Sequence, residues 1–179
     1  MFSSRLRKFA LILICLSCGV IGSVAANLPD QSDYQLHLYN IHTREHLDVV
    51  YRHGDRYDAD ALVRINEYLR DYRTGSIREY DPQVFDLLHD VVASVGHADG
   101  EIQIVCGYRT PHTNEYLRTH GHGVARHSLH MQGKAIDIRV PGVSAAKLRD
   151  AALALHRGGV GYYADSNFVH VDTGRVRRW

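Results

Sequence analysis

The stretch "SLHMQGKAIDIRV", residues 128–140, joins a strand pattern to polar side chains of the kind that bind metals. In its second half Ile136, Ile138 and Val140 fall on one face of an extended chain, and Asp137 falls on the other. Successive side chains of a β-strand point to opposite faces, so this alternation predicts a strand with one buried side. The buried side holds the strand in a sheet, and Asp137 is left pointing away from the core.

A second strand with the same alternation is predicted near the C-terminus, in "FVHVDTG" (residues 168–174). Its two valines share one face, whereas Phe168, His170 and Asp172 share the opposite face. If the two strands are neighbours in the sheet, Asp137 and His170 project toward one point.

His130 lies seven residues before Asp137, and an odd spacing would put the two on opposite faces of an unbroken strand. Gly133 lies between them, and its conformational freedom permits a turn that brings His130 back. Two histidines and one carboxylate suit a catalytic zinc ion, because three protein ligands leave a fourth position for a water molecule whose pKa the cation lowers. These residues alone leave a solvated polar face without a metal as the alternative.

The rest of the chain mixes strand and helix patterns. The segments "YQLHLYN" and "EHLDVVYR" alternate on either side of a turn-like "IHTR" and predict a β-hairpin, and "EIQIVCGYR" predicts a strand that ends near Gly107. Apolar spacing predicts a helix from Leu62 to Tyr72, closed by Gly75. Three more helices are predicted: one that Asp81 caps, with Pro82 as its first residue, a short one over 111–118, and one over 145–157 after Ser144. This order of elements favours an α+β fold.

The N-terminus has the pattern of a secretory signal peptide. A basic run, "SRLRK", precedes the apolar run "FALILICLSCGVIG", which is shorter than the ~20 residues of a membrane span. Small residues follow in "SVAA", so we expect a signal peptide over residues 1–26, cleaved after Ala25 or Ala26. The less favoured alternatives are an uncleaved N-terminal anchor and a lipoprotein modified at Cys15 or Cys18.

A single domain is then expected over residues 27–179, a length that suits one domain rather than two. Only Cys106 remains in it, so no internal disulfide can form, and export without disulfides favours a bacterial envelope protein. The net charge of +1 gives no basic field for nucleic acid.

The segment "SLHMQGKAID" matches the S-x-H-x-x-G-x-A-x-D pattern of the LAS metallopeptidases, a group that includes zinc D-Ala-D-Ala peptidases and the hedgehog signalling domain. The C-terminal "GGVGYYADSNFVHVDTGRVRRW", together with "LRDYRTGSI" and "CGYRT", resembles the murein endopeptidase K (YcbK-type) branch of that group over nearly the whole mature chain. The resemblance implies a small antiparallel sheet carrying a zinc site, with packed helices. It also implies that His130, Asp137 and His170 are the zinc ligands.

The resemblance further implies that Arg109, in "GYRT", stabilises the oxyanion of a tetrahedral intermediate, as a fixed cation aimed at developing negative charge does. The general base is less clear, because Phe168 and Asn167 stand where relatives carry a catalytic histidine or glutamate. Asp172 is the remaining candidate catalytic residue: it either poises the water or orients His170, and orientation is slightly favoured. Tyr162 and Tyr163 fit groove lining and strand packing equally well. The tail "RVRRW" suits contact with anionic glycan strands, or Trp179 caps the core.

We therefore expect an exported, monomeric zinc metallopeptidase of the periplasm that acts on peptidoglycan. The resemblance implies hydrolysis of the meso-diaminopimelate–meso-diaminopimelate (3–3) cross-link, the D-Ala–meso-diaminopimelate cross-link, or both. Two alternatives stay open: a carboxypeptidase that trims stem peptides, and a zinc-binding module without activity. Manganese or cobalt would be able to replace zinc in vitro.

Overall fold

The computed structural model describes residues 32–121 and 123–179. The predicted signal peptide (1–26), the start of the predicted domain and His122 lie outside the described residues. No helix in the described part of the chain is long and apolar enough to cross a membrane.

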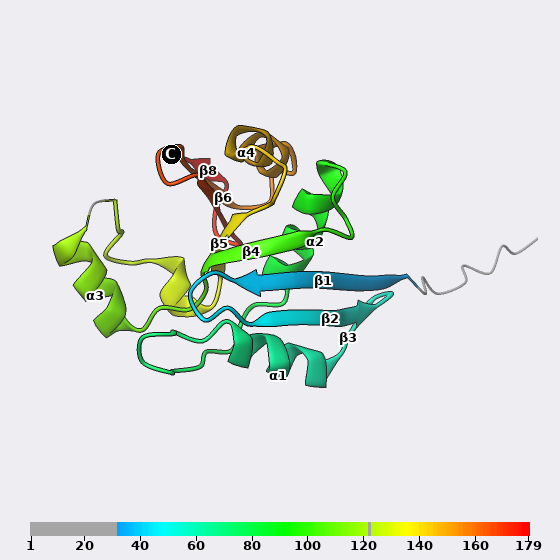
Figure 1. The fold of residues 1–179 in the computed structure, drawn as a ribbon, viewed down its shortest axis with the longest axis horizontal. Helices are drawn as coiled ribbons and strands as arrows, with labels where there is room; N and C mark the ends of the chain where they lie inside the picture. Colours follow the sequence, from blue (N-terminus) through cyan, green and yellow to red (C-terminus); the bar gives the residue numbers. More distant parts are fainter. Residues whose placement is uncertain (1–31, 122) are drawn as a thin grey trace, which may run out of the picture.

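In this part of the chain, eight strands form one sheet in the order β3-β2-β1-β4-β5-β7-β6-β8 (Figure 1). Most neighbouring strands are antiparallel, but β1 pairs in parallel with β4, and β6 in parallel with β8. The α+β class is confirmed, and the sheet that carries the candidate site is mixed and larger than the small antiparallel sheet expected. The strands are β1 (Asp33–Asn40), β2 (His46–His53), β3 (Arg56–Tyr57), β4 (Glu101–Cys106), β5 (Ala135–Arg139), β6 (Gly159–Tyr163), β7 (Phe168–Asp172) and β8 (Arg177–Arg178).

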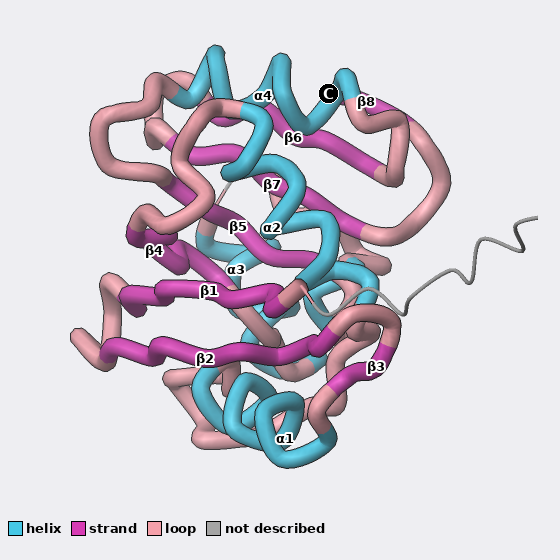
Figure 2. The backbone as a smooth tube through the Cα atoms, turned by 90° about the vertical axis from the view of Figure 1, so that its right-hand side faces the viewer, coloured by secondary structure: helices cyan, strands magenta, loops and turns pink. Residues whose placement is uncertain are grey.

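Within the described residues, the sheet is accompanied by four α-helices and one 3-10 helix: α1 (Ala59–Tyr68), α2 (Gln83–Ser94), α3 (Pro111–His120), η1 (Leu129–Gln132) and α4 (Ala145–Ala154). Figure 2 shows α2 crossing one face of the sheet, with α3 behind the opposite face. The hairpin predicted at the start is β1 and β2, which pair antiparallel.

The hydrophobic core consists of buried side chains of the central strands and of helices α1, α2 and α4. Val169 and Val171 of β7 are fully buried, as are Ile136 and Ile138 of β5. Burying an aliphatic side chain of this size contributes roughly 1.5–3 kcal/mol. This packing fixes β5 and β7 side by side, with their polar residues on the face opposite the core.

The first helix ends earlier than the sequence predicted. It stops at Tyr68, and Tyr72 and Gly75 lie in a turn that follows it. The cause is Asp71, whose N–H donates to the carbonyl of Ser76 while its own carbonyl accepts from the N–H of Gly75. This turn replaces further helical hydrogen bonds, so the apolar spacing alone was misleading.

The Asp71 side chain connects that turn to the start of α3. It is 1% exposed, and its Oδ2 accepts from both the backbone N–H and the hydroxyl of Thr110, each at 2.9 Å. Its Oδ1 accepts from the N–H of Arg73 at 3.0 Å. Since Thr110 directly follows Arg109, Asp71 fixes the backbone from which Arg109 extends.

The other predicted helix starts differ little from the structure. Helix α2 begins at Gln83, one residue after the predicted start, and Asp81 Oδ1 accepts from the N–H of Gln83 at 3.1 Å. Helix α4 is capped by Ser144, whose hydroxyl accepts from the N–H of Lys147, and it ends at Ala154, before the predicted end.

Candidate metal centre

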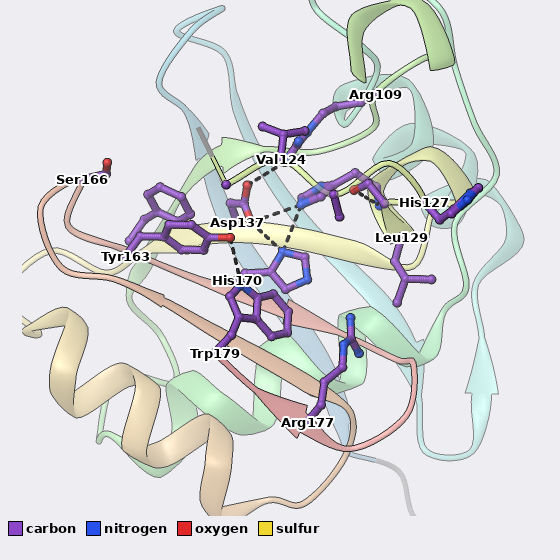
Figure 3. A pocket seen from close by; sticks show the side chains of 15 residues that line it. Arg109, Val124, His127, Leu129, Asp137, Tyr163, Ser166, His170, Arg177 and Trp179 are labelled. Atoms are coloured by element: carbon purple, nitrogen blue, oxygen red, sulfur yellow. Dashed lines mark hydrogen bonds and ion pairs between the residues drawn. The ribbon is translucent and has the colours of Figure 1, made fainter. Parts of the chain in front are cut away.

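Strands β5 and β7 place Asp137 and His170 directly opposite each other. The two residues are partners in the antiparallel register, so their side chains leave the same face of the sheet. Asp137 is 4% exposed and His170 is 7% exposed. Asp137 Oδ1 and His170 Nδ1 lie 2.8 Å apart (Figure 3), so the two strands are neighbours and their polar side chains meet at one point.

His130 reaches the same point from the 3-10 helix η1, not from a strand. The Ser128 hydroxyl accepts from the N–H of His130 at the start of η1, and Gly133 ends it with a left-handed φ of 66°. A side chain at Gly133 would come within 2.4 Å of the carbonyl oxygen of Glu79. His130 Nε2 lies 3.1 Å from His170 Nδ1 and 3.2 Å from Asp137 Oδ1.

The outward nitrogens of both histidine rings bind hydrogen-bond acceptors. His130 Nδ1 lies 2.8 Å from the carbonyl oxygen of Gly107, and His170 Nε2 lies 2.9 Å from Asp172 Oδ2. Neither acceptor carries a proton to share, so each of these nitrogens must donate one. The inward nitrogens then present lone pairs, and these converge with the Asp137 carboxylate on one point. A cation at that point would be bound favourably.

A zinc ion fits this set of donors. Ligand atoms about 2.0–2.2 Å from zinc lie about 3.4 Å apart in a tetrahedral arrangement, so the three atoms would need to spread by only a few tenths of an ångström. Burial lowers the pKa of His130, but the charges of Asp137 and Cys106 outweigh burial and raise that pKa to about 9. In the metal-free protein the cluster therefore attracts a proton, which a metal ion would displace.

Cys106, at the end of β4, gives a second possible ligand set. Its half-buried thiol has ligand atoms of His130 and Asp137 close by, all within 4.8 Å of one another. The thiol is also 3.0 Å from Arg109 Nε, which donates to it. The shorter distances among His130, Asp137 and His170 favour the set without Cys106.

Arg109 lies at the wall of the centre. Its Nη2 donates to Asp137 Oδ2 at 3.2 Å, and its side chain is 12% exposed. Burial lowers the pKa of Arg109, but the charges of Cys106 and Asp137 outweigh burial and raise it. The guanidinium is therefore a fixed cation beside the point where the three ligand atoms meet.

Asp172 lies behind the His170 ring, on the side away from Asp137. It is fully buried, and besides His170 it accepts from the N–H groups of Gly159 and Gly174 and from both terminal nitrogens of Arg177. Burial raises its pKa, but these hydrogen bonds outweigh burial and hold the pKa well below its usual range. A carboxylate with all its acceptor positions occupied is suited to orient His170, not to take a proton from water.

Asp172→Asn tests this orienting role. We expect zinc affinity and kcat/KM each to fall about 10- to 100-fold, the usual cost of losing an outer hydrogen-bond partner of a ligating histidine. Zinc affinity is measured by competition with a chelator, and Asp150→Asn, at an exposed ion pair with Arg149, is the matched control. A much larger fall in kcat with zinc affinity unchanged would instead make Asp172 the proton acceptor.

The candidate centre opens into a cleft with four walls: Arg109, the loop before η1, the β6–β7 turn and the C-terminal segment. Of the described residues that line it, Asp137 alone has a carboxylate side chain. Phe168 lines the cleft too, and its ring stacks on that of Tyr163. A phenyl ring has no group that accepts a proton, so Phe168 cannot be the general base. His127 also lines the cleft, and it is exposed.

The sequence did not single out the support that β8 gives this site. Gly159 and Gly161 leave space on β6 that Arg177 and Trp179 fill; a side chain at Gly161 would come within 2.7 Å of the Trp179 ring. The Trp179 ring centre lies 5.1 Å from that of His170. The signal in the sequence was the Gly-x-Gly of "GVGYY", which removes side chains from one face of a strand.

Comparison with known proteins identifies the family of the chain. Residues 29–179 match a family described as peptidoglycan L,D-endopeptidase MepK. The chain is 36% identical over 178 residues to the peptidoglycan L,D-endopeptidase MepK of Escherichia coli (strain K12), covering 99% of this chain and 97% of the relative. It is 40% identical over 140 residues to the probable peptidoglycan L,D-endopeptidase MepK of Haemophilus influenzae, covering 78% and 75%. No solved structure matches. The chain therefore belongs to the MepK family of peptidoglycan L,D-endopeptidases.

Proposed function

We propose that this protein is a zinc-dependent peptidoglycan endopeptidase that hydrolyses peptide cross-links of the cell wall. The observation that supports this most is the convergence of His130, Asp137 and His170 within 3.2 Å at the base of a cleft. Membership of the MepK family supplies the substrate class. The cofactor, the ligand set and the bond that is cleaved are parts of the proposal.

The names of the relatives favour one cross-link. They are called L,D-endopeptidases. A 3–3 cross-link joins the L-centre of one meso-diaminopimelate to the D-centre of the next, whereas a D-Ala–meso-diaminopimelate bond joins two D-centres. The 3–3 cross-link is therefore the proposed substrate, and the second bond is the alternative.

The residues of the candidate centre have separate proposed parts in the reaction. A zinc ion held by His130 Nε2, His170 Nδ1 and Asp137 Oδ1 would polarise the scissile carbonyl and lower the pKa of a water molecule. Asp172 holds the His170 ring in the tautomer that exposes Nδ1. Arg109 has N–H groups beyond those bound to Asp137 and Cys106, and these would meet the carbonyl oxygen as it gains negative charge.

Zinc is proposed over other divalent ions because two imidazoles and one carboxylate suit it, with manganese or cobalt as substitutes in vitro. Residues 1–26 are proposed to be a cleaved signal peptide that delivers residues 27–179 to the periplasm. The mature protein is proposed to act as a monomer.

Digestion of purified murein with and without a chelator tests the function. We expect the wild type to remove 3–3 cross-linked dimers, with chelation stopping this and zinc restoring it, as read by chromatography of the muropeptides. Release of free D-Ala alone would mean a carboxypeptidase. No turnover with one zinc ion bound would mean a zinc-binding module without activity.

A further inference from the structure

Tyr163, the last residue of β6, extends its side chain into the cleft. It pairs across the sheet with Phe168, and the two rings stack with their centres 4.4 Å apart. Figure 3 shows its hydroxyl directed toward the part of the cleft that holds Asp137 and His170. The sequence left open whether Tyr163 lines the groove or packs in the sheet, and the structure places it in the groove.

Trp179 fixes the Tyr163 hydroxyl in one hydrogen-bonding role. Its indole Nε1 donates to the Tyr163 oxygen at 3.0 Å. Indole nitrogen is only a donor, so the tyrosine oxygen accepts, and the hydroxyl hydrogen stays available for another acceptor. Among the described residues, no acceptor for that hydrogen is present.

The indole itself is held by its surroundings. It lies over Gly161, packs against the His170 ring, and has the Arg177 guanidinium over it, 4.9 Å from the ring centre. Arg177 also binds Asp172, the partner of His170. One set of contacts therefore fixes both the orientation of His170 and the position of the Tyr163 hydroxyl.

Tyr163 and Arg109 line the same cleft from different walls. A preorganised donor at a point where negative charge develops is worth about 10²- to 10³-fold in kcat. The Tyr163 hydroxyl, on a different wall from Arg109, would be a second donor to the carbonyl oxygen that gains negative charge.

We propose that Tyr163 is a catalytic residue that donates its hydroxyl hydrogen bond to the scissile carbonyl oxygen as it becomes an oxyanion, and that Trp179 positions this hydroxyl. The inference rests on the proposed function. No covalent bond forms at Tyr163 and no proton leaves it, so the hydroxyl is a hydrogen-bond donor throughout.

Tyr163→Phe tests the role of the hydroxyl. We expect kcat on a 3–3 cross-linked muropeptide dimer to fall about 100-fold with KM changed less than about twofold, because the bond forms in the transition state. Tyr162→Phe is the matched control: it is the neighbouring tyrosine, packs toward the core and lies under Arg149, away from the cleft. Its kcat is expected to equal that of the wild type.

Trp179→Phe tests the positioning role, because it keeps an aromatic ring and removes the N–H. We expect kcat to fall about 5- to 10-fold, as for one lost hydrogen bond, and to fall no further when Trp179→Phe is added to Tyr163→Phe. If Trp179→Phe merely damaged the structure, it would lower kcat by the same factor in the wild type and in Tyr163→Phe.

A second readout does not depend on turnover. A phosphinic analogue of the cross-link carries a tetrahedral anionic group in place of the amide, and its affinity is measured by calorimetry. We expect Tyr163→Phe to weaken its binding by about the same factor as kcat/KM, with zinc content and melting temperature unchanged. If the wild type is active and Tyr163→Phe has the same kcat and the same affinity for the analogue as the wild type, the role of Tyr163 is overturned but the proposed function is not. A wild type without turnover overturns the proposed function, and the inference with it.

Discussion

Replacing His170 by alanine is expected to abolish both zinc binding and cleavage of murein. In the proposed zinc centre His170 supplies one of the three inward ligand atoms, and its ring lies 4.9 Å from that of His130. A catalytic metal contributes several kcal/mol of transition-state stabilisation, so kcat/KM should fall by at least about 10³-fold. Zinc content, measured by elemental analysis of protein purified without added metal, should fall from about one ion per chain to well below that.

His112→Ala is the matched control, since His112 is an exposed histidine on α3 that does not line the cleft. Asp137→Asn, nearly isosteric, guards against loss of the fold and should show the same two losses. Circular dichroism should report folded protein for all three variants. Full zinc content and full activity in folded His170→Ala would mean that the ion is held elsewhere, as by Cys106.

Replacing Arg109 by alanine is expected to lower kcat by about 10²- to 10³-fold, with a smaller change in KM. The guanidinium is held in place by Asp137 and Cys106, and Asp71 fixes the backbone of the next residue, so it needs no rearrangement to meet an oxyanion. Arg109→Lys keeps the charge but loses the planar fork, and it should recover only part of the activity.

The measurement is steady-state hydrolysis of a cross-linked muropeptide by variants loaded with zinc. Arg118→Ala is the control, because Arg118 is exposed and pairs with Glu115 on α3. A loss confined to KM would assign Arg109 to substrate binding. If loss of zinc accounts for the whole fall in kcat, the role of Arg109 is to neutralise the charge of Asp137.

The sequence predicts the parts of the site that follow from strand alternation. Asp137 and His170 each lie on the polar face of a period-two strand, and the structure pairs them directly. His130 could be placed only conditionally, because its direction depends on the 3-10 turn that Gly133 ends. The place of Trp179 depends on β8 pairing with β6, and local periodicity carries no information about that pairing.

The fold differs from the sequence-based prediction where contacts between distant segments decide the structure. Helix α1 ends where Asp71 binds the 71–76 turn and the start of α3, contacts between segments 39 residues apart that helical spacing does not reveal. The large mixed sheet arises because β4 pairs with β1 on one side and β5 on the other. Strand existence was predictable here, whereas strand order was not.

An anomalous diffraction map recorded at the zinc edge from crystals of the mature protein tests the proposed zinc centre most directly. One strong peak is expected, about 2.0–2.2 Å from His130 Nε2, His170 Nδ1 and Asp137 Oδ1 alike. A peak bonded to the Cys106 sulfur instead of His170, or no peak between these three side chains in zinc-saturated crystals, would contradict the proposed centre.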